Sequence, residues 1–173
     1  MGRSTAYWGS NLYLSESEEP DPAAPLQDLP GPVASRFRAV REGLLGLPGV
    51  SEQVRFMGPT WRWAWEYGIG NRKLCWLHLM KNGVDVTFTL SENDESRLGK
   101  GARLAGVVSR ALTEGQRTGP VKWCWLELGD RRSIDAFLSL ARRKAEWLAE
   151  RPTPRRAPRL HRGSSSSEGF EAD

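Results

Sequence analysis

The fold is decided by residues 61–90, which read WRWAWEYGIGNRKLCWLHLMKNGVDVTFTL. Two turn signals, Asn71-Arg72 and Asn82-Gly83, divide this run into the extended segments 61–69, 73–80 and 84–90. An Asn-Gly pair between such segments is the strongest short-range signal of a β-hairpin. Strands joined by turns this short must be antiparallel neighbours. We therefore expect an antiparallel meander in the middle of the chain.

Amphipathic helical patterns lie on both sides of the meander. Residues 32–47 begin with a proline, which suits the first turn of a helix, and continue with apolar residues three or four apart. Residues 91–112 begin with Ser91 and Asp94 at the spacing of a capping box. The pattern over 130–148 is the strongest, and its first residue, an aspartate, is a candidate N-cap. The sequence therefore predicts three helices.

Two more extended segments, 54–57 and 121–128, precede the meander and the last helix. The order of elements is then helix, strands, helix, strand, helix. This order predicts an α+β fold, with an antiparallel sheet of four to five strands and helices packed mainly on one face. Segments 73–80 and 121–128 are apolar at both alternating positions, so we expect both to be central strands buried on two faces.

The length of 173 residues suits one domain with a sizeable core. We place this domain at residues 30–151. Residues 1–29 hold one arginine, five acidic residues and several prolines, and residues 152–173 are first basic and then rich in serine. Segments of this composition bury too little apolar surface to offset the entropy lost on ordering. The sequence therefore predicts a disordered acidic arm and a disordered basic tail.

Composition argues against several classes of protein. Two cysteines and two histidines, without a CxxC or HExxH spacing, predict neither a metal site nor a metal cofactor, and no other cofactor is indicated. Cys75 and Cys124 are expected to be reduced and buried. No apolar run long enough for a membrane span or export signal occurs, so we expect a cytoplasmic protein of bacterial type. The net charge of +4 comes without a nucleic-acid-binding motif, and we do not expect nucleic acid as a partner.

Tryptophan is the unusual component, because it supplies eight of the 16 aromatic residues. Side chains of a strand alternate between the two faces of a sheet. By this alternation, each of three strands carries its large aromatic residues on a single face. If those faces coincide, they form one aromatic surface, edged by His78 and Glu127, from Trp63, Trp65, Tyr67, Trp76, Trp123 and Trp125.

Three functions stay open for this surface. The favoured one is a small-molecule-binding domain, since indole rings offer area, stacking and cation–π attraction to a flat or cationic organic ligand. The second is a hydrolase of a reactive aromatic or natural-product-like molecule, with Glu66, His78 or Glu127 as general base. In the third, the same aromatic residues form a second core or an interface with a partner or a second copy of the chain. We favour binding over catalysis.

Five motifs follow one another over about residues 30–150: Phe56-Met57-Gly58, Trp61 to Tyr67, Lys73-Leu74-Cys75, Gly83 to Phe88 and Gly119 to Leu126. In these motifs the chain resembles a bacterial family known as domain of unknown function 3788. The resemblance implies a small α+β fold and no established activity. It also implies a build similar in outline to gyrase-inhibitor-like domains, which accept cationic or aromatic molecules and in some branches hydrolyse reactive natural products. Trp65 and Trp76 are particular to this chain.

Overall fold

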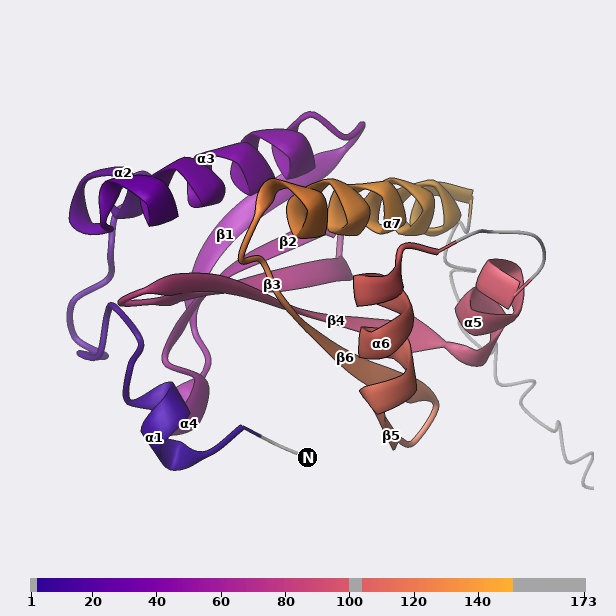
Figure 1. The fold of residues 1–173 in the computed structure, drawn as a ribbon, viewed down its shortest axis with the longest axis horizontal. Helices are drawn as coiled ribbons and strands as arrows, with labels where there is room; N and C mark the ends of the chain where they lie inside the picture. Colours follow the sequence, from indigo (N-terminus) through magenta and orange to yellow (C-terminus); the bar gives the residue numbers. More distant parts are fainter. Residues whose placement is uncertain (1–2, 100–103, 151–173) are drawn as a thin grey trace, which may run out of the picture.

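A computed structural model describes residues 3–99 and 104–150 and contains a six-stranded antiparallel sheet (Figure 1). Its strands, in the order β1-β2-β3-β4-β6-β5, are β1 (Val50–Phe56), β2 (Trp63–Ile69), β3 (Arg72–Met80), β4 (Gly83–Ser91), β6 (Val121–Glu127) and β5 (Gln116–Thr118). The α+β class is confirmed, but the sheet has six strands where four to five are predicted. The additional strand is β5, which at three residues is too short to show a period.

Two long helices, α3 (Gly31–Leu45) and α7 (Arg131–Glu150), cover one face of the sheet, and α2 (Pro25–Asp28) leads into α3 (Figure 1). The helices α5 (Glu92–Gly99) and α6 (Gly106–Glu114) connect β4 to β5. The two short helices α1 (Thr5–Trp8) and α4 (Gly58–Trp61) lie on the opposite face, where Trp8 and Trp61 contact His78 of β3. Within the described ranges, no helix combines the length and apolar character needed to cross a membrane.

Local signals placed the starts of α5 and α7 and the turn between β3 and β4 correctly. The helix predicted over 91–112 is instead divided into α5 and α6, and residue 61, predicted as strand, belongs to α4. Ser91 and Asp94 each accept a hydrogen bond from the other's backbone N–H, which caps α5. Asp130 and Ser133 form the same reciprocal pair at the start of α7. The predicted hairpin at Asn82 joins β3 and β4. Capping boxes and tight turns are specified by residues close in sequence, and this is why the sequence alone reveals them.

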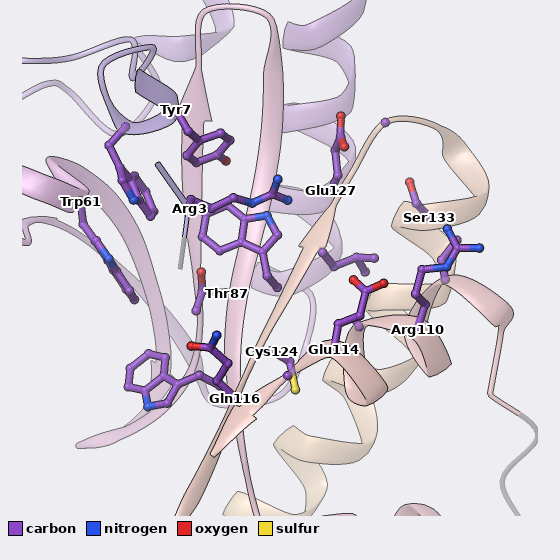
Figure 2. A pocket seen from close by; sticks show the side chains of 18 of the residues that line it. Arg3, Tyr7, Trp61, Thr87, Arg110, Glu114, Gln116, Cys124, Glu127 and Ser133 are labelled. Carbon is purple, nitrogen blue, oxygen red and sulfur yellow. The ribbon is translucent and has the colours of Figure 1, made fainter. Parts of the chain in front are cut away.

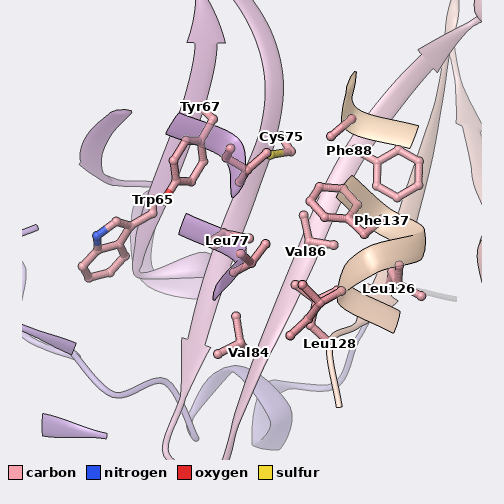
Figure 3. Close-up of a cluster of buried hydrophobic side chains, with 14 of the residues drawn as sticks. Trp65, Tyr67, Cys75, Leu77, Val84, Val86, Phe88, Leu126, Leu128 and Phe137 are labelled. Atoms are coloured by element: carbon pink, nitrogen blue, oxygen red, sulfur yellow. The ribbon is translucent and has the colours of Figure 1, made fainter. Parts of the chain in front are cut away.

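The main core lies between the sheet and the helices α3 and α7 (Figure 3). Phe37 of α3 meets Trp65 edge-on with ring centroids 6.0 Å apart, and Phe137 of α7 lies 6.0 Å from Phe88. The two helices approach closely at Gly43, where a Cβ atom would lie only 2.5 Å from Leu138 Cδ1. This position therefore favours glycine, although glycine lowers helix propensity.

The N-terminal arm differs from the prediction, because residues 3–29 pack against the sheet. The Leu12 N–H donates to the Leu79 carbonyl over 2.8 Å, and the Lys81 N–H donates to the Ser10 carbonyl over 2.9 Å. Two core indoles also donate to arm carbonyls: Trp63 Nε1 to Ser15 over 2.7 Å and Trp65 Nε1 to Pro22 over 3.0 Å. These contacts join residues far apart in sequence. They stabilise the ordered arm against the loss of conformational entropy, which the composition of the arm alone does not reveal. The predicted tail at 152–173 lies outside the described residues.

One ammonium group is buried in the main core. The side chain of Lys144 in α7 is only 4% exposed, and its Nζ donates to the Leu74 carbonyl over 2.8 Å. Leu74 has no partner in β2, because the pairing passes from Tyr67–Cys75 directly to Gly68–Lys73. The lysine therefore satisfies a carbonyl that the irregularity in the ladder leaves unpaired. Burial lowers the pKa of Lys144 to about 8.

Replacing this lysine is expected to change how stability depends on pH. Between about pH 8 and 10.5 the unfolded chain holds a proton on Lys144 that the folded chain has lost, so folding gains stability as pH rises through this window. In Lys144→Met that gain disappears. Urea unfolding at pH 7.5 and 10.5 should show the wild-type stability rising relative to the variant by up to about 3 kcal/mol. A constant difference between the two proteins across this range would contradict the assignment.

Candidate functional site

The register of β2 against β3 separates the predicted aromatic surface into two parts. Trp65 stands opposite Leu77 and Tyr67 opposite Cys75, so Trp63, Trp65 and Tyr67 face the helices and belong to the main core. Trp76 and His78 stand opposite Glu66 and Ala64 on the other face. The prediction of one surface with six aromatic residues is therefore wrong for β2. Alternation shows which residues of one strand share a face, but not which faces of neighbouring strands coincide.

The aromatic residues of β2 can be buried in the main core because each of their polar groups, the Tyr67 hydroxyl and the two indole N–H groups, forms a hydrogen bond. Tyr67 Oη donates to Glu52 Oε2 over 2.6 Å, and Arg41 of α3 holds both oxygens of the same carboxylate. The indole N–H groups of Trp63 and Trp65 donate to the arm. Buried polar groups satisfied in this way carry little penalty. These three residues are structural in their contacts.

A second aromatic assembly covers the opposite face, and we name it the tryptophan layer. It consists of Tyr7, Trp8, Trp61, Trp76, His78, Trp123 and Trp125. Trp8 and Trp61 stack with centroids 5.6 Å apart, as Trp76 and Trp123 do at 5.5 Å. Trp8 is 5% exposed. The centre of this face is thus filled by the chain's own arm, while Trp61, Trp123 and Trp125 stay partly exposed at its border.

His78 lies at the centre of the tryptophan layer and is fully buried. Its ring stacks on Trp125 at 5.1 Å and meets Trp8 and Trp61 edge-on, and its Nε2 shares a hydrogen bond with Thr87 Oγ1 over 2.9 Å. Burial lowers the pKa of His78 to about 3, so the imidazole is neutral at pH 7. A base so enclosed cannot meet a substrate without displacement of the surrounding indoles.

Glu66, another candidate base, is engaged in ion pairs. Its carboxylate accepts hydrogen bonds from Lys73 Nζ and, over 2.9 Å, from Trp76 Nε1, and it lies 3.5 Å from Arg55 Nε. Burial alone would raise the pKa of Glu66, but the bonds from Lys73 and Trp76 outweigh it and lower the pKa. The carboxylate therefore orients Trp76 rather than taking up a proton near neutral pH.

An open concavity of about 1440 Å³ borders the tryptophan layer (Figure 2). Of the residues predicted to bind ligand, only Trp123 and Trp125 line it, and of the candidate bases only Glu127 does. Arg3, Tyr7, Trp8 and Trp61 from α1, α4 and the arm line it on the same side. On the other side lie residues of α6 and the first turn of α7.

An acidic corner lies where the arm meets β4 and β6. Asp85 stands directly opposite Glu127 in the ladder, and Tyr7 Oη donates a hydrogen bond to Asp85 Oδ2. Burial, reinforced by Glu127, raises the pKa of Asp85 to about 6, although the hydrogen bond from Tyr7 and the charge of Arg3 oppose the rise. Burial also raises the pKa of Tyr7 well above its ordinary value, so the phenol stays a hydrogen-bond donor.

A cation already occupies this corner. The Arg3 guanidinium carbon lies 4.9 Å from the Tyr7 ring centroid and 5.0 Å from that of Trp125 (Figure 2). Both distances are within the range of cation–π attraction. Sequence reasoning missed Arg3, Tyr7, Trp8 and Asp85. Two signals in the sequence pointed to them. Trp8 lies in an arm predicted to be disordered because of its composition, and Asp85 lies in a strand that is otherwise largely apolar.

Other chemistry is restricted by the same structure. Cys75 and Cys124 are free thiols, and burial raises their pKa values to about 12 and 11, which keeps both in the protonated form. Over residues 3–99 and 104–150, no group of three or more His, Cys, Asp or Glu side chains could hold a metal ion. The site can therefore offer aromatic surface, negative charge and a carboxyl group that titrates near pH 6.

Comparison of the chain with known protein families, curated proteins and solved structures finds no match. The resemblance to domain of unknown function 3788 therefore stays a prediction, and the functional argument depends on the geometry of the site.

Removing the central indole is expected to destabilise the protein. Trp8→Ala should lower the free energy of unfolding by about 3 kcal/mol or more, because it leaves a cavity between Trp61, His78 and Trp125. Leu14→Ala is the matched control in the same arm, since Leu14 is 42% exposed, and it should cost less than about 0.5 kcal/mol. Urea unfolding measures both. Equal effects of the two substitutions would show that the arm is not part of the folded unit.

Proposed function

We propose that this protein binds a small organic cation with a flat, delocalised group, at the corner formed by Tyr7, Trp125, Asp85 and Glu127. The observation that carries the proposal is the position of the Arg3 guanidinium, which lies against both the Tyr7 ring and the Trp125 ring. A guanidinium is itself a flat, delocalised cation. The chain's own side chain therefore indicates the chemistry that this corner accepts.

Electrostatics support a cationic ligand at this place. Asp85 and Glu127 stand on adjacent strands and face the same side of the sheet, and Glu127 belongs to no ion pair within the described residues. Two neighbouring carboxylates repel each other, and a cation between them relieves the repulsion. The aromatic rings next to the carboxylates also attract the cation. A ring is less strongly hydrated than a charged group, so less water must be removed from it when the cation binds.

The shape of the site supports a ligand of modest size. Trp8 and His78 already fill the centre of the tryptophan layer, so the area left for a ligand is the partly exposed border of Trp125, Trp123 and Trp61. The concavity is open and adjoins this border. A single aromatic ring with a charged group would cover it, with its charge replacing that of Arg3.

Binding of phenylguanidinium tests this proposal. Intrinsic fluorescence of the Trp147→Phe protein should change saturably on titration, while the neutral phenylurea should cause little change. Trp125→Ala should weaken binding about tenfold or more, as expected for a partly desolvated cation–π contact. Arg3→Ala should strengthen binding several-fold, because it removes the internal competitor.

The control for the aromatic substitution is Trp147→Ala. Trp147 also carries an arginine over its ring, with the Arg97 guanidinium carbon 5.6 Å from the centroid, but it lies on α7 away from the concavity. This variant should bind phenylguanidinium as the wild type does. If phenylguanidinium caused no saturable change even in Arg3→Ala, or bound Trp125→Ala as tightly as Trp147→Ala, the proposed site would be wrong.

The affinity for the cation should also depend on pH. A cation binds more tightly to the ionised form of Asp85, and the pKa of this carboxyl is about 6, so affinity should rise between pH 5 and 7 as the proton leaves. We expect a rise of roughly fivefold, and its absence in Asp85→Asn. Calorimetric titration in buffers of different ionisation enthalpy would also detect the proton released on binding. An affinity that falls over this interval would exclude Asp85 as the counter-charge.

A further inference from the structure

The outer edge of β6 is only partly covered by its neighbour. β5 pairs with Val121, Lys122 and Trp123. Among residues 3–99 and 104–150, the rest of β6, residues 124–127, is paired on the β4 side alone. Four residues of extended chain span about 13 Å. An uncovered strand edge of this kind can pair with another extended chain.

The backbone groups that point outward from this edge follow from the ladder. The Leu128 N–H donates to the Val84 carbonyl, so Leu126 and Cys124, at even steps from Leu128, also direct their backbone groups toward β4. Trp125 and Glu127 direct theirs away from β4. No backbone hydrogen bond joins these two residues to a described residue on the outer side. Two N–H groups and two carbonyls thus form an unused half of a ladder.

Residues 124–127 of this edge line the concavity. Figure 2 shows Gln116 at one end of the edge, Glu127 at the other, and Glu114 and Arg110 of α6 alongside it. On one side of the strand the wall is aromatic and acidic, with Trp125 and Glu127. On the other side Leu126 and Val107 supply apolar surface, next to Arg110 and Glu114 of α6. An added strand would alternate its side chains between these two walls.

We infer that the concavity binds an extended peptide, which adds a strand antiparallel to β6 at residues 124–127. The fitting peptide alternates basic and aliphatic residues. Its basic side chains lie beside Trp125 and Glu127, and its aliphatic side chains pack on Leu126 and Val107. Charge complementarity commits the site to basic rather than acidic residues, because Glu127 is exposed and pairs with no cation in the described chain. This inference concerns the strand edge and does not depend on the binding of a free organic cation.

Backbone methylation of a model peptide provides the test. The probe is acetyl-Val-Lys-Val-Lys-Val-amide, whose lysine N–H groups face β6 in the antiparallel arrangement. N-methylation of both lysines removes these donors and should weaken binding about tenfold or more, whereas N-methylation of the third and fifth residues, both valines, should change affinity less than about twofold. Isothermal titration measures the affinities. The Trp125 and Glu127 amides should become protected from hydrogen exchange when the unmethylated peptide binds.

A charge reversal provides the second arm of the experiment. Glu127→Lys, at an exposed position, should change the preference from the lysine peptide to acetyl-Val-Glu-Val-Glu-Val-amide. Equal binding of the two methylated peptides, or no binding of the unmethylated one, overturns strand addition even if phenylguanidinium binds. A dimer whose formation protects the same two amides would also overturn it, because a second copy of the chain would then be the occupant.

Discussion

The sheet carries large apolar side chains on both of its faces, and each face must be removed from water for the chain to fold. The long helices of the described chain, α3 and α7, both lie on one face (Figure 1). At the centre of the other face, Trp8 of α1 and Trp61 of α4 stack on each other and cover His78. The N-terminal arm meets this need: Ser10 and Leu12 form hydrogen bonds with the chain at the end of β3, and Trp8 lies against His78 of the same strand.

Much of the fold was predictable because its signals are local. Residues close together in sequence determine the hairpin at Asn82, the capping pairs at Ser91 and Asp130 and the periods of the helices. The site was harder to predict from the sequence. It depends on which faces of neighbouring strands coincide and on the contacts of Trp8 with Trp61 and Trp125, which are distant in sequence. Neither depends on nearby residues alone. Trp65 and Trp76, read as one surface, are separated by the sheet itself.

The cover of the second face also explains why the acidic corner exists. Tyr7 is carried into the corner by the same turn of helix that buries Trp8, and its hydroxyl reaches Asp85. The desolvation that this causes raises the pKa of Asp85, and Arg3, four residues before Tyr7, supplies a compensating charge from the arm itself. Packing of the arm and the electrostatics of the site are thus a single arrangement, and a change in one alters the other.

The length of β5 determines what remains open beside this arrangement. A strand long enough to pair with all of β6 would cover residues 124–127, but the chain leaves α6 only at Gly115, and β5 begins at the next residue. Gly115 itself approaches the sheet closely, since a Cβ there would lie 3.0 Å from Cys124 Sγ. The chain therefore changes from helix to strand beside Cys124, and β5 begins only opposite Trp123. In the part of the chain that the structure describes, the edge beyond Trp123 has no strand partner, because the residues that precede β5 are helical.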